Sequence, residues 1–205
     1  MRIESWEREA AIHLVEVLVS NGICSSLNER ALVDLFNEKL RKLGFGYGAG
    51  MTKACFWHED LDEWVIKVGY TERVSKDYAR AEYENYKAAV EANLAYYFPF
   101  TDFLYESNGI EFFIQERAEC DEEVVTSDWC DKLAIHYEEN DIDFNPDYIW
   151  DEVCEMEDYD KIDLMFNDYE LCAFLSTHKI GDFHEGNFGF IGDRTVICDF
   201  SGYAG

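Results

Sequence analysis

A segment near the C-terminus gathers oxygen-donating side chains around a predicted β-hairpin. Residues 188–198 are two short strand-like runs joined by Gly192-Asp193, a pair typical of a type II′ turn. Such a hairpin places Asn187, just before its first strand, beside Asp199, just after its second. Asp182, five residues before Asn187, can reach the same end over a short loop. Two such oxygen donors suit Mg²⁺, and the remaining carboxylate can orient or deprotonate a hydroxyl.

These residues resemble the catalytic loop of kinases. Asp182 and Asn187 match the protein-kinase D-x-x-x-x-N, and Asp-Phe-Ser-Gly from Asp199 is similar to the D-F-G metal-binding motif. Residues 181–187, Gly-Asp-Phe-His-Glu-Gly-Asn, look closer still to the G-D-L-H-x-G-N loop of the aminoglycoside- and choline-kinase-like branch. The resemblance implies that Asp182 is catalytic, that Asn187 and Asp199 hold Mg²⁺, and that His184 contacts phosphate or props Asp182. The alternative is ordinary turn chemistry, in which Asp and Asn bond locally.

A glycine-rich segment lies upstream, between two predicted helices and the first predicted strand. It spans residues 44–50 and includes Gly46, Gly48 and Gly50. Glycines let backbone amides approach phosphates without obstruction by side chains. The resemblance implies that this segment covers the phosphates of ATP, whereas a flexible connector is the alternative.

A lysine follows in a predicted strand. Residues 64–67, Trp-Val-Ile-Lys, resemble the V-A-I-K strand of kinases, which implies that Lys67 grips the α- and β-phosphates. Alternation puts Lys67 on the face opposite its apolar neighbours, either at a solvated edge or in a cleft. Kinases pair this lysine with a glutamate on the next helix, predicted here over roughly residues 75–94. We favour Glu82 over Glu84, because the tyrosine four residues after Glu82 would pack on the same side.

The next predicted strand resembles the one that leads into the kinase hinge. Residues 112–118 read Phe-Phe-Ile-Gln-Glu-Arg-Ala, with Gln115 at the gatekeeper place. The backbone from Glu116 to Ala118 would then hydrogen-bond adenine. The matching elements occur in the family's order across residues 44–202, and the implied cofactors are ATP and Mg²⁺.

The elements that must position these residues indicate an α+β fold. Helices are predicted over 1–22, from a capping box opening at Ser26, over about 75–94 and over 169–178. Strands are predicted over 52–57 and 64–68, and near 103–106 and 110–116. The resemblance implies a protein-kinase-like two-lobe fold with a minimal, truncated C-terminal lobe. Its parts would be an N-terminal helical extension, a kinase-like N-lobe and an acidic C-lobe, at 1–43, 44–118 and 119–205.

The resemblance has departures. Ile180 stands where the family has a histidine, and Ser201 replaces the first glycine after D-F. No activation segment or A-P-E motif follows, so the resemblance concerns nucleotide and metal rather than the phosphate acceptor. In this respect the chain resembles the very short kinase-fold proteins found among bacterial effectors and phage proteins. Those proteins lack the same region and rely on a partner.

Charge and cysteine content limit the partners and the setting. The net charge is −27, and residues 119–170 hold 20 of the 44 acidic residues. Such a surface repels nucleic acid and anionic lipid, and its natural complement is a basic protein. The alternative is that the carboxylates serve only solubility. Seven scattered cysteines without a C-x-x-C pair favour a reducing cytoplasm over disulfides or zinc. No stretch approaches the ~20 apolar residues that would span a membrane.

Two functions therefore compete. The first is an ATP/Mg²⁺-dependent phosphotransferase that phosphorylates a protein hydroxyl with the help of a partner. The second is a catalytically weak or inactive kinase-like protein that binds and modulates a basic partner through its acidic surface. A small-molecule kinase is a third possibility, resting on the Gly-Asp-Phe-His loop.

Overall fold

The computed structural model describes residues 2–25, 27–50, 52–70, 77–119, 169–180 and 187–202. The chain divides into two compact units, residues 1–84 with 100–117 and residues 85–99 with 118–205. Helices combine with antiparallel strands, so the α+β class is confirmed. Helix α3 (Tyr78–Glu91) contributes its first half to the first unit and its second half to the second.

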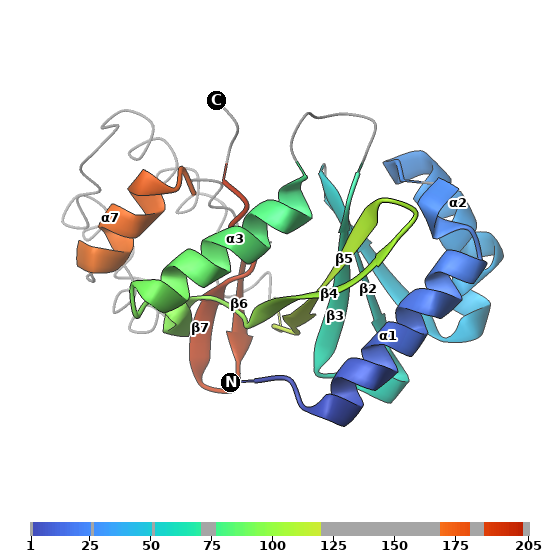
Figure 1. The fold of residues 1–205 in the computed structure, drawn as a ribbon, viewed down its shortest axis with the longest axis horizontal. Coiled ribbons are helices and arrows are strands. Elements are labelled where there is room, and N and C mark those ends of the chain that lie inside the picture. The colour runs from blue at the N-terminus through green and yellow to red at the C-terminus, as the bar shows by residue number, and fades with distance from the viewer. Residues whose placement is uncertain are drawn as a thin grey trace, which may run out of the picture. The chain divides into compact units, whose positions relative to one another are not determined.

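The first unit contains a five-stranded antiparallel sheet in the order β1-β2-β3-β5-β4 (Figure 1). Its strands are β1 (Phe45–Ala49), β2 (Lys53–His58), β3 (Trp64–Gly69), β4 (Thr101–Ser107) and β5 (Ile110–Glu116). Short 3-10 turns are η1 (Ile23–Ser25), η2 (Leu40–Leu43) and η3 (Glu59–Leu61). β4 and β5 meet at Asn108-Gly109, where both residues have positive φ, as a type I′ hairpin requires.

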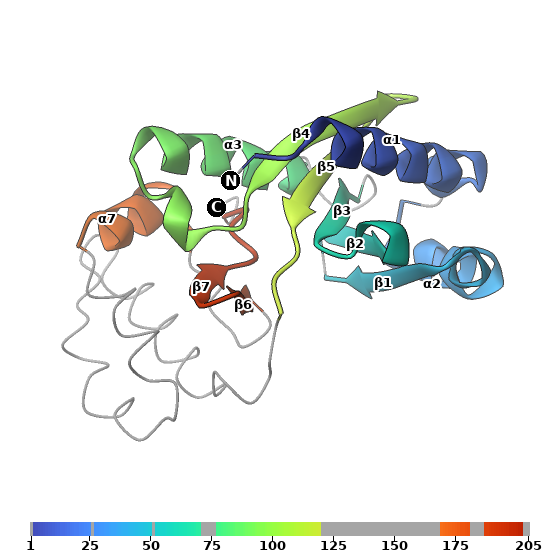
Figure 2. The same cartoon turned by 90° about the horizontal axis from the view of Figure 1, so that it is seen from below.

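One face of this sheet forms the main core with α1 (Ser5–Ser20) and α2 (Glu29–Glu38). The strands supply alternate residues, among them Phe56, Ile66 and Ile114, and the helices supply Leu18 and Leu32, all of them buried. Helix α1 contacts β4 and helix α2 contacts β1 (Figure 2). Residues 1–43, predicted as a helical extension, thus belong to the first unit and share its core.

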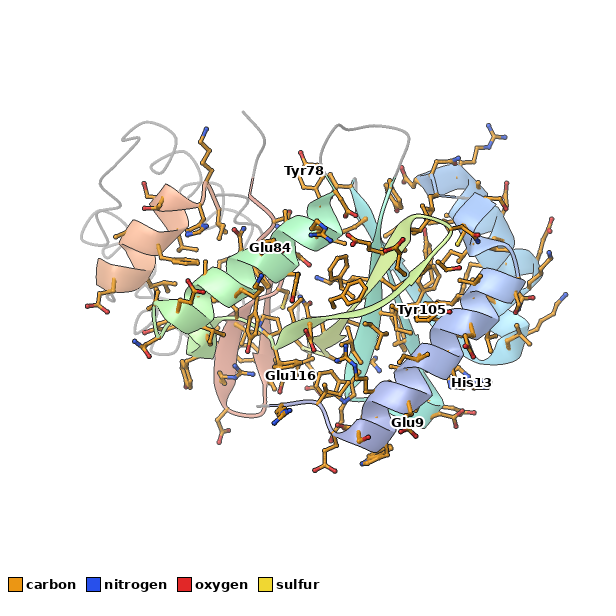
Figure 3. All side chains as sticks on the ribbon, viewed as in Figure 1. Glu9, His13, Tyr78, Glu84, Tyr105 and Glu116 are labelled. Carbon is orange, nitrogen blue, oxygen red and sulfur yellow. The ribbon has the colours of Figure 1, made fainter. Side chains whose placement is uncertain are left out.

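Polar contacts fix both N-terminal helices. Helix α1 begins with a capping box between Glu4 and Glu7, and the second oxygen of Glu7 accepts a 2.9 Å bond from Trp64 Nε1 on β3. The opposite side of α1, which carries Glu9, is exposed (Figure 3). Helix α2 begins later than predicted, because Asn28 and not Ser26 is its N-cap: the Asn28 side chain accepts from the amide of Ala31 at 2.9 Å.

The second unit places a helix and a hairpin around a small aromatic core. It contains η4 (Ala95–Tyr97), α7 (Tyr169–Thr177), β6 (Phe188–Ile191) and β7 (Arg194–Ile197). The ring of Phe98 lies 4.9 Å from that of Phe200 and 5.7 Å from that of Phe174. Only Gly192 of the predicted two-residue turn has positive φ, at 60°, as in a type II′ turn.

Two further observations concern only the part of the chain that the structure describes. Within it, no helix is both long and apolar enough to cross a membrane. Within it, Cys24, Cys55 and Cys198 are not in disulfide bonds.

Candidate functional site

Two lysines and a glutamate meet on the face of the sheet opposite the main core. Lys67 Nζ on β3 lies 2.9 Å from Glu82 Oε2, and Lys53 Nζ on β2 lies 3.1 Å from Glu82 Oε1. All three side chains are buried, and that of Glu82 is completely so. We call these residues the Lys–Glu cluster. One carboxylate therefore holds two ammonium groups, with a separate oxygen for each.

The ion pair between Lys67 and Glu82 is the one expected from the sequence. Glu84 lies elsewhere on α3, half-exposed and 3.6 Å from Arg80 (Figure 3). Of the two glutamates considered, Glu82 is therefore the one that contacts Lys67.

The start of helix α3 positions Glu82. Asp77 caps the helix, its Oδ1 accepting from the amides of Ala79 and Arg80 at 3.0 and 3.1 Å. Gly69, the last residue of β3, makes room for this cap, because a Cβ there would overlap the Asp77 carboxylate. The Tyr83 ring packs 5.6 Å from that of Phe113, the direct neighbour of Lys67 on β5. The cap and the ring contact together orient Glu82 toward β3.

Lys53 is the member of the cluster that sequence reasoning missed. Lys67 lies opposite Cys55 in the β2–β3 register, so Lys53, two residues away on β2, is its diagonal neighbour on the same face. The predicted strand over residues 52–57 already contained Lys53, and strand alternation together with the pairing register would have found it. The register of β2 against β3 was the information needed to place Lys53 beside Lys67.

Burial of the Lys–Glu cluster has a cost in electrostatic free energy. Removing a carboxylate and two ammonium groups from water is costly, and only close, well-aligned partners offset that cost. A buried ammonium held in this way is a preorganised donor, which can bind an anionic oxygen with little rearrangement.

The glycine-rich segment is a strand, contrary to the connecting loop expected. Gly46 and Gly48 lie within β1, paired with Trp57 and Cys55 of β2, and Gly50 follows the strand. Gly46 has a structural task, since a Cβ there would overlap the Trp57 ring. A Cβ at Gly50 would meet nothing within 4 Å. Of the three glycines singled out in residues 44–50, only Gly50 would therefore have open space beside an added Cβ.

The predicted hinge follows β5 directly. Gln115 is buried and donates a 3.0 Å bond to Thr101 Oγ1 on β4. The amide of Glu116 donates to Phe100 O and that of Arg117 to Glu63 O, both at 2.8 Å. Those two amides are therefore occupied by the fold. Within the described residues, the amide of Ala118 donates to no backbone carbonyl.

The hairpin of the second unit has the pairing that the sequence suggested. β6 and β7 pair Phe188 with Ile197, and the ladder continues with a 2.7 Å bond from Cys198 N to Asn187 O. Asp199 follows immediately, so Asn187 and Asp199 leave the same end of the hairpin. Asn187 is buried.

Local hydrogen bonds hold the Asp199 carboxylate. Its Oδ1 accepts from Ser201 Oγ at 3.0 Å and from Ser201 N at 3.4 Å. Together with Asn187 this gives one carboxylate and one amide at the end of a hairpin, a donor set whose hard oxygens fit Mg²⁺. Among the residues described, no group of three or more His, Cys, Asp or Glu side chains gathers as a metal site.

The remaining site predictions lie outside the described residues. Asp182 and His184 fall in the segment 181–186, and the acidic stretch from residue 120 to 168 is likewise not described. No protein-family model and no curated protein sequence matches this chain.

Proposed function

We propose that this protein is an ATP- and Mg²⁺-dependent phosphotransferase of the kinase fold, acting on a protein hydroxyl together with a basic protein partner. The observation that carries the proposal is the buried ion pair of Lys67 with Glu82. It joins the third strand of the sheet to the helix that follows, the place at which protein kinases make the pair that positions the nucleotide phosphates.

The chain's own residues divide the work in this proposal. Lys67 binds the α- and β-phosphates and Glu82 orients it, while the backbone at Gly46, Gly48 and Gly50 covers the phosphates. Asn187 and Asp199 hold Mg²⁺, which supplies neutralisation of the charge that develops on the transferred phosphoryl group. Asp182 orients the acceptor hydroxyl and accepts its proton, and His184 contacts phosphate or props Asp182. Catalysis of this kind is mostly positioning and electrostatic stabilisation.

Nucleotide binding is tested by thermal unfolding with ATP alone, Mg²⁺ alone and both together. We expect Mg-ATP to raise the Tm, since a ligand at about 100 times its Kd adds about 2.7 kcal/mol to the stability of the folded state. Asp199→Ala should abolish the rise, and Glu84→Gln, at a half-exposed position of α3, should respond as the wild type does. Absence of any rise with nucleotide would contradict the proposal.

Transfer is tested by incubating the protein with radiolabelled ATP and a cell lysate. We expect label on a protein acceptor with the wild type and none with Asp182→Asn, which keeps the size of the side chain and removes its basicity. Equal labelling by both proteins would assign the activity to a contaminant.

The acidic composition favours a second function, binding to a basic protein. The excess of 44 acidic over 17 basic residues supports it. On this alternative a basic protein is captured, the capture weakens steeply with salt, and Asp182→Ala leaves it intact. Capture that is insensitive to salt would count against it. The two functions are compatible, since an acidic face can recruit the substrate of an active kinase.

A further inference from the structure

A short hydrogen-bonded relay lies directly beside Asp199 within the second unit. Asn85, in the second half of α3, donates from Nδ2 to the carbonyl oxygen of Phe200 at 2.6 Å. Asn85 Oδ1 lies 3.0 Å from Nδ1 of His178, the residue that follows α7. Three segments distant in sequence therefore meet near the peptide group that joins Phe200 to Ser201.

Donor and acceptor directions in this relay are determined by chemistry. A carbonyl oxygen only accepts, so the Asn85 side chain must present its NH₂ group to Phe200. Its oxygen then faces His178, whose Nδ1 must carry the hydrogen. Burial lowers the pKa of His178, which favours the neutral ring. The neutral Nδ1–H form satisfies the relay without a net charge.

Packing keeps both ends of the relay in place. The His178 ring stacks on Phe174 at 4.2 Å between centroids. The Phe200 side chain is completely buried and lies against Phe98. Asn85 therefore connects two ordered groups, and its amide fixes the carbonyl orientation of the residue between Asp199 and Ser201.

We propose that Asn85 and His178 are positioning residues for metal binding by Asp199. The Asp199 carboxylate is oriented by Ser201, and the peptide between those two residues is held by Asn85. Loss of the relay frees that peptide to rotate and moves the carboxylate from its metal-binding orientation. Outer-shell partners of metal ligands are worth about 10- to 100-fold in metal affinity.

Helix α3 gives this relay a second consequence. The same helix carries Glu82, which holds two lysines, and three residues later Asn85, which holds the backbone after Asp199. A shift of α3 along its axis would disturb both sets of contacts. The inference rests on the proposed function, since it takes Asp199 to be a metal ligand.

The test measures the Mg²⁺ concentration that gives half of the ATP-dependent rise in Tm. Asn85→Asp keeps the shape of the side chain and sets an oxygen against the Phe200 carbonyl. We expect it to raise the half-maximal Mg²⁺ concentration by about tenfold or more. The matched control is Asn93→Asp, the same chemical change at an exposed position of the same unit, which should leave the value unchanged.

The outcomes separate the two proposals. A merely structural role of Asn85 would lower the Tm without ligand and leave the Mg²⁺ midpoint unchanged, which would overturn this inference but not the proposed function. A wild type without any response to Mg-ATP would overturn both. If Asn85→Asp does not fold, His178→Phe, which keeps an aromatic ring against Phe174 and removes the donor, should shift the same midpoint in the same direction. An unchanged midpoint in His178→Phe would also overturn the inference.

Discussion

The candidate functional residues of the two units are held in place by different means. In the first unit the functional groups project from strands and a helix, and the Lys–Glu cluster is held by buried ion pairs. In the second unit Asn187 and Asp199 flank a hairpin. The Asp199 carboxylate accepts from Ser201, and the relay holds the carbonyl of Phe200, the next residue. The Lys–Glu cluster therefore depends on charge balance. The orientation of Asp199 depends on the direction of the peptide group between Phe200 and Ser201.

This difference predicts that substitutions in the two units affect folding and binding differently. Damage to the Lys–Glu cluster leaves a buried charge without its counter-charge and should affect folding as well as binding. Damage to the Asp199 side should affect metal and nucleotide binding with a smaller effect on folding. The following predictions test this contrast, from the largest expected effect to the smallest.

Glu82→Gln should have the largest effect on stability. It leaves two ammonium groups buried around a neutral amide, and breaking a buried ion pair in this way costs about 3–5 kcal/mol. Urea unfolding of Glu82→Gln beside Glu84→Gln measures it, and the second variant should stay within about 0.5 kcal/mol of the wild type. Equal unfolding midpoints for the two variants would refute the assignment of the buried carboxylate.

The two lysines of the cluster should differ in function more than in stability. Lys67→Met and Lys53→Met each remove one ammonium from Glu82, at about 1–3 kcal/mol for the partner left unsatisfied. If Lys67 alone grips the nucleotide, only Lys67→Met abolishes the Mg-ATP rise in Tm, and Lys53→Met retains it. The reverse pattern would move the phosphate contact from β3 to β2.

Because the relay contains His178, we expect the free energy of unfolding to depend on pH over a narrow range. Burial holds the pKa of His178 below its ordinary value of 6.5, so the unfolded chain binds the proton more tightly than the folded one. The stability that His178 contributes is therefore fully present above about pH 6.5 and is lost as the pH falls through the lowered pKa.

His178→Phe provides the comparison, because phenylalanine does not titrate. We expect the Tm advantage of the wild type over this variant to shrink between pH 7.5 and pH 5.5. An advantage that grows on acidification would mean that the histidine is charged in the folded protein.

Arg80→Ala should have the smallest effect. Arg80 donates twice to Glu111, through Nε at 2.6 Å and through Nη2, and so ties α3 to β5. Its side chain is 49% exposed, so water and salt screen the pair and we expect less than about 1 kcal/mol. Chemical unfolding at low and high salt measures the change in the free energy of unfolding. A loss of several kcal/mol that salt does not reduce would show that the Arg80–Glu111 contact stabilises the fold more than a surface ion pair does.

Local patterns predicted much of the fold. Strand alternation located β2, β3 and β5, and the Gly192-Asp193 pair located the turn between β6 and β7. The contact of Lys67 with a glutamate of the next helix was expected from the kinase resemblance, and helix spacing favoured Glu82. These features depend on residues close in sequence, for which propensity and period carry the information.

Features that depend on tertiary pairing were missed. Lys53 joins the cluster only because the β2–β3 register sets it diagonal to Lys67. The glycines of β1 were expected in a loop, but they form a strand in which Gly46 makes room for Trp57. The relay joins residues 85, 178 and 200, whose side chains have no shared local pattern.

Calorimetric titration of ATP into the protein, with and without Mg²⁺, tests the central claim most directly. The account predicts that the wild type binds ATP tightly only with Mg²⁺, and that Lys67→Met and Asp199→Ala, altered in different units, each lose this binding. Asp182→Asn should keep it. Binding of Mg-ATP by both Lys67→Met and Asp199→Ala with the wild-type affinity, or no Mg²⁺-dependent binding by the wild type, would contradict the account.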